Sequence, residues 1–348
     1  MVAAPPYRLE RLGVVMEPLA GDPQEAEGVL NPASARGPDG DLYLFPRMVA
    51  RGNFSRIGRA RVIFDKDRRP SGVERLGVVL EPDEAWEQNA VTAGVEDPRI
   101  TFITTLDAYV MAYAAYGPLG PRIGLAFSRD LISWKRLGPV SFGYQPSMRT
   151  DLNLYSNKDA MFFPEPVPGP DGEPAFAMLH RPVWNPSWPL PAGVTDERHS
   201  IWASFVAADS VASDLRALTR LDQHRQVAQP QEPWEATKIG AGTPPIRVPE
   251  GWLIIYHGVT RGEAQAGERV PVRYVAGAMV LDPQDVSRVL SRSQSPLLEP
   301  ETKEEREGIV DSVVFPTAID VREDGAADVY YGMADFRIGA ARLRRVAP

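Results

Sequence analysis

RIGRA (56–60) returns as RIGLA (122–126) and again as RIGAA (337–341), so one short pattern recurs over most of the chain. Each copy follows an aromatic-rich stretch, namely DLYLF, AYVMAYAAY or DVYYGMA. In these stretches apolar side chains recur with the period of two that is typical of β-strands. The same elements recurring in the same order indicate a repeat architecture.

Two further segments keep this order of elements without the RIG letters, which makes five copies. Each copy opens near a proline, turns through glycine, aspartate or proline as hairpins require, and contains about four short strands. The copies span 31–64, 96–138, 156–211, 238–290 and 313–346. Their spacing predicts an all-β fold, a five-bladed β-propeller, that forms one catalytic domain over residues 1–348. A solenoid would need shorter and more even periods. Helical periodicity is confined to 208–220, where we expect one short insertion.

The composition excludes several classes of function. The chain has no cysteine, which excludes disulfides, thiolate metal sites and a cysteine nucleophile. Its net charge is −8, so nucleic acids and anionic membrane surfaces are poor partners. No apolar run is long enough to span a membrane, and no secretory leader is recognisable, so we expect a cytoplasmic protein. The four histidines have no metal-ligand spacing, and we expect neither a metal nor an organic cofactor.

Charged residues cluster near the opening of each copy. In a propeller these positions surround a central funnel, and convergent charges in a concave site indicate an active site. The residues concerned are Arg47, Arg51, Asn53, Glu96, Asp97, Arg99, Lys158, Asp159, Lys238 and Asp335.

A series of motifs identifies a family when taken together. They are GVEDPRI (94–100), the Asn-Lys-Asp-Ala…Pro-Glu segment (157–165), HRP (180–182), GAGTPPI followed by GWLIIYHGV, and YYGMADFRIG. The chain resembles glycoside hydrolase family 130, the β-mannoside phosphorylases and related β-mannosidases, over nearly its whole length. The resemblance implies a five-bladed propeller and an inverting attack on the anomeric carbon of a β-mannosyl residue. It implies inorganic phosphate as co-substrate and α-mannose 1-phosphate as product. Related phosphorylases commonly form oligomers, so a homo-oligomer is a further expectation.

The resemblance also implies roles for individual residues. Asp97 takes the place of the family's proton donor, whose proton is thought to travel through the mannose 3-hydroxyl. Lys238 and His257 match positions that bind phosphate in the phosphorylases, and Lys158 and Arg181 are further candidates. An inverting hydrolase needs a carboxylate base for water instead of these cations. We therefore expect phosphorolysis, with a β-mannosidase as the alternative.

Other roles stay open on the sequence alone. Arg47, Arg51 and Asn53 resemble the family's sugar-contacting stretch, and Glu96, Arg99 and Asp335 are further sugar-binding candidates. Every candidate site residue has an ordinary structural role as its alternative. For example, Asp97 could cap a turn, and His257 could be a satisfied core residue. Trp184 and Trp188 could form a platform for sugar or pack in a core or an oligomer. A non-catalytic sugar-binding propeller and an arabinanase-like glycosidase remain as other classes. The linkage and the acceptor sugar depend on the motif-poor loops 65–93, 139–155 and 183–199.

Overall fold

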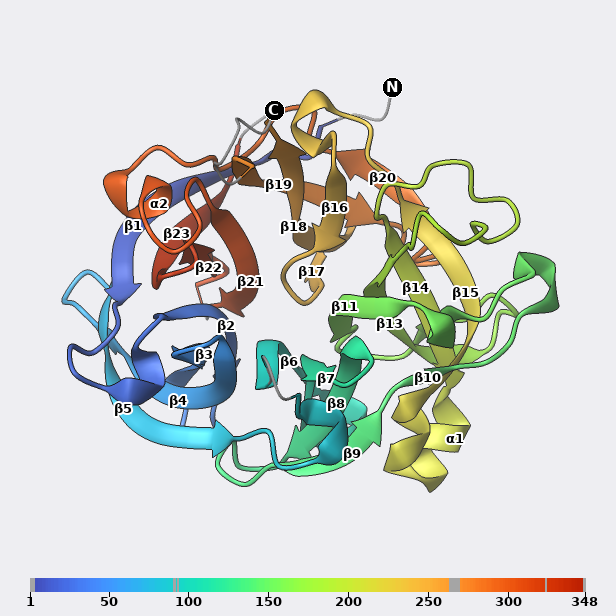
Figure 1. The fold of residues 1–348 in the computed structure, drawn as a ribbon, viewed down its shortest axis with the longest axis horizontal. Coiled ribbons are helices and arrows are strands. Elements are labelled where there is room, and N and C mark those ends of the chain that lie inside the picture. The colour runs from blue at the N-terminus through green and yellow to red at the C-terminus, as the bar shows by residue number, and fades with distance from the viewer. Residues whose placement is uncertain (1–3, 90–91, 93, 263–269, 323, 347–348) are drawn as a thin grey trace.

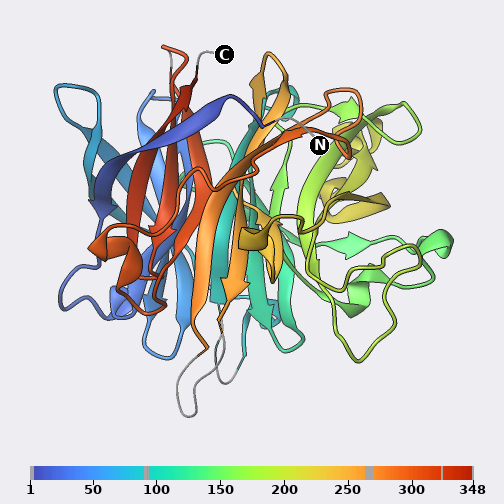
Figure 2. The ribbon, with the colours of Figure 1, turned by 90° about the horizontal axis from the view of Figure 1, so that it is seen from above.

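The computed structural model describes residues 4–89, 92, 94–262, 270–322 and 324–346. Within these ranges nearly all regular structure is β-strand, so the predicted all-β class is confirmed. Five groups of strands follow one another around the centre of the view in Figure 1, and Figure 2 shows the same groups from above. No helix among the described residues is long and apolar enough to cross a membrane.

The strands of each group are mostly antiparallel neighbours in sequence order. The first group contains β2 (Gly28–Arg36), β3 (Leu42–Ala50), β4 (Phe54–Phe64) and β5 (Pro70–Leu80). The second contains β6 (Gly94–Ile103), β7 (Ala108–Gly117), β8 (Gly120–Ser128) and β9 (Lys135–Pro139). These two groups count as one eight-stranded sheet only through a single parallel bridge between Ser55 and Gly94.

The remaining three groups form separate sheets. The third contains β11 (Ser156–Phe162), β13 (Pro174–Val183), β14 (Ile201–Ala207) and β15 (Arg220–Ala228), with the short β10 (Ser141–Phe142) and β12 (Val167–Pro168). The fourth contains β16 (Lys238–Ala241), β18 (Gly251–Arg261), β19 (Val272–Leu281) and β20 (Val289–Arg292), with β17 (Ile246–Val248) beside β18. The fifth contains β21 (Val314–Val321), β22 (Ala327–Met333), β23 (Arg337–Arg345) and β1 (Tyr7–Met16). The first strand of the chain therefore completes the last group.

Helices are few and short. The α-helices are α1 (Ala208–Ser213) and α2 (Lys303–Arg306), and the 3₁₀ turns are η1 (Pro23–Glu25), η2 (Ala85–Glu87), η3 (Thr104–Leu106), η4 (Pro146–Met148), η5 (Leu152–Leu154), η6 (Leu215–Thr219) and η7 (Pro233–Glu235). The short insertion expected at 208–220 is confirmed by α1 and η6. The expectation of a loop at 65–93 was wrong for β5, whose largely exposed, glycine-interrupted sequence PSGVERLGVVL hides its alternation. Residues 90, 91 and 93 of that segment lie outside the described residues.

The hydrophobic core lies between neighbouring groups. Buried apolar side chains form five clusters, one each between the first and second, second and third, third and fourth, fourth and fifth, and fifth and first groups. Each sheet is thus covered on two faces by its neighbours, and the apolar contacts run around the whole ring. The strands nearest the centre are left to carry polar side chains inward.

A buried ionic cluster recurs beside three of the groups. In each, a glutamate on a one-turn helix accepts hydrogen bonds from a tyrosine hydroxyl and from an arginine of the outermost strand. We call these the scaffold clusters, and their members are Glu87–Tyr113–Arg136, Glu235–Tyr256–Arg292 and Glu305–Tyr331–Arg11. Arg11 lies on β1, so the first strand supplies the arginine of the cluster in the fifth group. In the second and fourth groups the arginine comes from β9 and β20.

Candidate functional site

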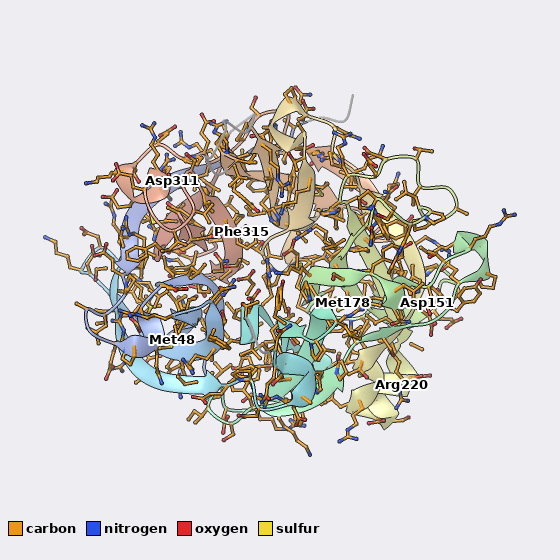
Figure 3. All side chains as sticks on the ribbon, in the orientation of Figure 1. Met48, Asp151, Met178, Arg220, Asp311 and Phe315 are labelled. Atoms are coloured by element: carbon orange, nitrogen blue, oxygen red, sulfur yellow. The ribbon has the colours of Figure 1, made fainter. Side chains whose placement is uncertain are left out.

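A cavity of about 410 Å³ lies where the five groups converge, and every group contributes to its wall. Phe315, one of its lining residues, is labelled beside the centre of the ring in Figure 3. The wall contains Asn31, Arg47, Asp97, Tyr116, Pro121, Ser156, Lys158, Asp159, Arg181, Val183, His199, Lys238, His257, Tyr274, Phe315 and Asp335. Most of these residues carry a polar or charged group, which suits a polar ligand rather than an apolar one.

A repeated distortion of the first strand of three groups builds part of this wall. The strand registers of β2, β6 and β11 shift between Leu30 and Ala33, Glu96 and Arg99, and Lys158 and Met161. Within these shifts Asn31, Asp97 and Asp159 have φ values of 44°, 48° and 55°, in the left-handed region that Asn and Asp tolerate best among non-glycine residues. β-bulges of this kind redirect side chains beside active sites. The internal repeat therefore brings three polar side chains into one cavity.

Asp97 is the best-connected carboxylate of the cavity. It is only 8% exposed, and its Oδ1 accepts hydrogen bonds from Asn31 Nδ2 at 2.8 Å and Arg47 Nη1 at 3.2 Å. Burial alone would raise its pKa, but the charges of Arg47, Lys158 and Arg99 outweigh burial and lower the pKa. These neighbouring charges therefore favour the carboxylate form of Asp97.

Asp335 behaves in the opposite way in the same cavity. It lies in the turn between β22 and β23, with φ at 48°. Burial raises its pKa to about 6, and the negative charge of Asp97 adds to the shift against the opposing charges of Arg47 and Lys238. The pKa values of two carboxyl groups in one cavity are thus shifted in opposite directions, a pattern found at acid–base sites.

The cations of the cavity are only partly neutralised by protein carboxylates. Lys158 Nζ lies 3.3 Å from Glu96 Oε2, and Arg181 Nε lies 2.5 Å from Asp159 Oδ2. Lys238 pairs with no carboxylate in the described part of the chain and instead lies over the Tyr274 ring, 5.2 Å from its centroid. Burial, followed by the nearby charge of Arg181, lowers the pKa of Lys238 to about 7. A buried lysine with its charge uncompensated is suited to receive an anion.

The two histidines of the cavity are neutral at ordinary pH. Burial lowers the pKa of His257 to about 3 and that of His199 to about 4. Both ring nitrogens of His257 are buried without a hydrogen-bond partner among the described residues. Gly240 makes room for this ring, since a Cβ there would lie 2.5 Å from His257 Cε1 and 2.2 Å from Asp159 Oδ2. His257 can therefore offer a ligand a hydrogen bond but not a full positive charge.

The structure brings most of the predicted site residues together. Arg47, Asp97, Lys158, Arg181, Lys238, His257 and Asp335 line the cavity. Glu96 and Arg99 are buried directly behind it: Glu96 accepts hydrogen bonds from Arg47 and Lys158, while an Nη2 of Arg99 lies 3.5 Å from Asp159.

Two predicted sugar-binding residues lie away from the wall of the cavity. Arg51 and Asn53 are exposed in the turn between β3 and β4, and neither lines the cavity. Asn53 still acts on the site indirectly, because its Oδ1 accepts a hydrogen bond of 2.8 Å from Arg47 Nη2.

Sequence reasoning assigned no role to several lining residues. They are Asn31, Tyr116, His199, Tyr274 and Phe315. Asn31 had a signal, since it opens the first repeat at the position where Asp97 stands in the second. His199 had none, because its place depends on a parallel bridge to Lys238 across a long loop.

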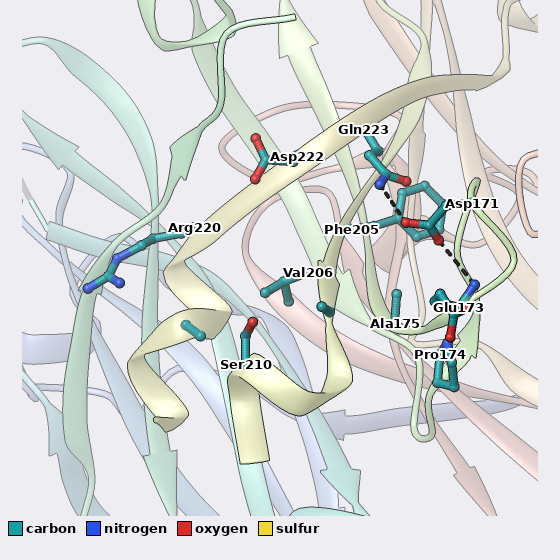
Figure 4. Close-up of a pocket in the computed structure, with 12 residues that line it drawn as sticks. Asp171, Glu173, Pro174, Ala175, Phe205, Val206, Ser210, Arg220, Asp222 and Gln223 are labelled. Carbon is teal, nitrogen blue, oxygen red and sulfur yellow. Dashed lines mark hydrogen bonds between the residues drawn. The ribbon is translucent and has the colours of Figure 1, made fainter. Parts of the chain in front are cut away.

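Other features of the described residues are weaker candidates for a functional site. A cavity of about 310 Å³ lies beside α1, and Figure 4 shows two hydrogen bonds in its wall, which Asp171 accepts from Gln223 Nε2 and from the Glu173 amide. Within the described ranges no three His, Asp or Glu side chains are grouped so that they could hold a metal ion.

Comparisons with known proteins identify the family. The family profile described as beta-1,4-mannooligosaccharide phosphorylase, of glycoside hydrolase family 130, matches residues 8–346. A 1,2-beta-oligomannan phosphorylase of Thermoanaerobacter sp. (strain X514) is 31% identical over 97% of both chains. A beta-1,2-mannobiose phosphorylase of the same organism is 32% identical over 76% of this chain and 69% of its own length. The structure of a beta-1,2-mannobiose phosphorylase from Listeria innocua in complex with beta-1,2-mannobiose superposes with a TM-score of 0.70, at 22% identity, over 97% of this chain and 96% of that one.

Proposed function

Since the chain belongs to glycoside hydrolase family 130, we propose that it is an inverting β-mannoside phosphorylase that transfers one mannosyl unit to inorganic phosphate. Relatives at 31% and 32% identity are named as phosphorylases of oligomannan and mannobiose. The observation that carries the proposal is the set of three cations, Lys158, Arg181 and Lys238, that faces the same cavity as Asp97. A non-catalytic sugar-binding protein has no need of this combination.

Phosphate is held by the cations and by His257. A dianion placed among Lys238, Arg181 and Lys158 gains charge-assisted hydrogen bonds, which are about twice as strong as neutral ones. His257 adds a neutral N–H donor to the same oxygens. The local charge is what matters, because the chain as a whole carries −8 and repels anions.

Asp97 is the proton donor, and phosphate binding prepares it for that role. A donor must be protonated before the reaction, yet the neighbouring cations lower the pKa of Asp97. The charge of a bound dianion offsets the field of these cations, so the pKa of Asp97 rises when both substrates are present. The proton then passes through the mannose 3-hydroxyl to the glycosidic oxygen as the bond from that oxygen to C1 breaks. The phosphate oxygen forms the new bond to C1, and the proton of hydrogen phosphate restores Asp97.

Asp159 is the carboxylate beside Arg181 and His257, so it is the candidate base for water that would attack from the phosphate-binding side of the cavity. Burial opposes its ionisation, but Arg181, His257 and Arg99 outweigh burial and lower its pKa. A carboxylate this acidic is a weak base for water. We assign Asp159 the task of orienting Arg181 and His257, which disfavours the β-mannosidase alternative.

The mannosyl unit lies against the carboxylate side of the cavity. Arg47 and Asp335 are placed to hydrogen-bond its hydroxyls, with Glu96 and Arg99 behind them and Arg51 and Asn53 at the outer turn. We propose in addition that the five groups are the blades of one closed β-propeller domain over residues 1–348. The pairing of β1 with β23 and the five interfacial apolar clusters support this interpretation.

The test is to measure products from β-1,2- and β-1,4-mannobiose with and without phosphate. We expect α-mannose 1-phosphate only when phosphate is present, and a rate about 10³-fold lower in Asp97→Asn, the upper part of the range for loss of an acid catalyst. Free mannose released at the same rate without phosphate would contradict phosphorolysis and favour the hydrolase. Full activity in Asp97→Asn would contradict the assignment of the acid.

A further inference from the structure

A groove of about 390 Å³ adjoins the catalytic cavity and shares His199 and Lys238 with it. One wall is apolar and comes from the loop after β13, with Trp184, Trp188 and Leu190. The lining also includes the polar groups of Glu197 and Arg261. Neither the catalytic residues nor the phosphate-binding set explains why this second space is present.

A column of aromatic rings supports the apolar wall. The Trp184 ring packs edge-on against the buried Trp202 ring, with 5.7 Å between the ring centroids, and against the Tyr155 ring, with 5.0 Å between the centroids. The Tyr155 ring in turn packs against Trp188, with 5.5 Å between the centroids. The column runs from the core of the third group to the surface, where Trp188 is 43% exposed. The exposed end of the column therefore lies in the lining of the groove.

The loop that carries Trp188 is also fixed by hydrogen bonds. The Trp188 amide donates to Asn185 O at 3.0 Å, and the Tyr155 hydroxyl donates to Pro189 O at 3.1 Å. The Ala192 amide donates to Met148 O at 2.7 Å, which ties the loop to η4. A ring held in this way loses little entropy when a ligand covers it.

We propose that this groove binds the acceptor-side sugar units of a manno-oligosaccharide, with Trp188 as the stacking platform that sets the preference for chain length. A groove lined by both aromatic rings and charged groups matches a pyranose, which has an apolar face and a polar rim. The proposal rests on the proposed function in one respect. If one mannosyl unit is transferred per reaction, all other units of the substrate must lie on the acceptor side. The groove opens from the cavity at Lys238 and His199, so a longer chain can continue into it.

The test compares chain lengths in matched variants. In Trp188→Ala we expect kcat/KM for mannotriose and mannotetraose to fall about fivefold to tenfold through KM, the size of effect that an aromatic contact supplies. Mannobiose is expected to change less than twofold, and Trp188→Phe to recover most of the loss. The control is Tyr144→Ala, which removes another exposed ring (63%) that does not line the groove, and which we expect to leave every substrate unchanged.

Two results would overturn the proposal. One is a kcat/KM in Trp188→Ala that changes equally for all chain lengths or that does not change for any of them. The other is a rise in KM for phosphate alone, which would make the groove an entrance for phosphate. Direct calorimetric binding of mannotriose, compared between Trp188→Ala and Tyr144→Ala, needs no turnover. If the wild type fails to release mannose 1-phosphate while this binding difference persists, the proposed function fails and the sugar groove stands.

Discussion

The buried charges of this molecule are of two kinds, and they differ in how completely they are satisfied. In the scaffold cluster of Glu305, the carboxylate accepts hydrogen bonds from Arg11, Tyr331 and the amides of Glu301 and Thr302. In the catalytic cavity, Lys238 has no carboxylate partner and His257 has two unpartnered nitrogens among the described residues. Buried polar groups are normally satisfied, so a pocket of unsatisfied ones indicates that a ligand completes them.

The difference also separates stability from chemistry. Removing one member of a satisfied buried cluster leaves its partners unpaired, which costs stability. Removing Asp335 or Lys238, whose charged forms are disfavoured by burial in the cavity, is not expected to cost stability and should affect ligand binding instead. Each prediction below tests one side of this division.

The largest effect is expected at the scaffold cluster that joins the first strand to the last group. In Glu305→Ala, Arg11 and the Tyr331 hydroxyl lose a buried partner, and we expect the free energy of unfolding to fall by about 3 kcal/mol. This lies at the low end for a buried pair because Arg11 is one-quarter exposed. Urea unfolding gives the change, and calorimetry with sulfate as a phosphate mimic should show unaltered affinity of the folded protein.

The matched control removes the exposed partner of the same arginine. Glu301 also pairs with Arg11, at 2.9 Å, but its side chain is 59% exposed. Glu301→Ala should therefore change the stability by less than about 0.5 kcal/mol. Equal losses in the two variants would show that the scaffold cluster is not distinguished by its burial.

The scaffold clusters also mark a limit of sequence reasoning about the fold. The five-fold repetition could be predicted because short segments of neighbouring residues recur along the chain, such as RIGRA, RIGLA and RIGAA. The joining of Glu305 to Arg11 could not, since it links positions nearly the whole chain apart and neither residue stands in a motif. Outer strands such as β5 were also hidden, because exposure on both faces removes the alternation that a half-buried strand shows.

Some properties of the site could likewise be predicted from the sequence, and others could not. The sequence identified eight of the residues that line the cavity, namely Arg47, Asp97, Lys158, Asp159, Arg181, Lys238, His257 and Asp335. The sequence could not predict the pKa values of these residues. Asp97 and Asp335 are both aspartates, and only their surroundings lower the pKa of Asp97 and raise that of Asp335. Nor could sequence show that His257 is neutral, because that follows from its burial among Arg181, Lys238 and Arg99.

The second prediction uses the opposite pKa shifts of the two aspartates. The pKa of Asp335 is raised to about 6 in the folded protein, above its unfolded value of 3.8, so the folded state binds the proton more tightly. Its ionisation therefore lowers stability as pH rises from about 4 to about 6, and the penalty is complete above that range. Asp335→Asn removes this penalty and should stabilise the protein by about 2 kcal/mol at about pH 8, with no gain near pH 4, as measured by thermal unfolding.

Asp97→Asn is the control of opposite sign. Its pKa is lowered by folding, so ionised Asp97 contributes stability above its unfolded pKa and loses it as pH falls through the folded value. At about pH 8 the Asn variant should therefore be less stable than the wild type. A stabilising effect in both variants would mean that simple charge reduction, not the arrangement around Arg47, governs the cavity.

The smallest expected effect concerns the unpaired Lys238. Its pKa of about 7 means that it is charged below that pH and neutral above it while no anion is bound. Sulfate stays a dianion across this range, so any pH dependence of its binding reports on the protein. We expect calorimetric sulfate affinity to fall about tenfold between about pH 6 and pH 8, because above its pKa Lys238 must take up a proton when the anion binds.

Two substitutions isolate this lysine from the other groups of the cavity. Lys238→Met should bind sulfate about tenfold more weakly than the wild type at about pH 6 and show little dependence on pH. Lys238→Arg keeps its charge at all these pH values, so its sulfate affinity should also stay level with pH, but near the wild-type value at low pH. A wild-type pH dependence that persists in both variants would assign the titration to another group and would leave Lys238 as one more satisfied buried residue. The division between scaffold clusters and cavity would then rest on the atoms of Asn31 and His257 that have no hydrogen-bond partner among the described residues, and these atoms provide no charge.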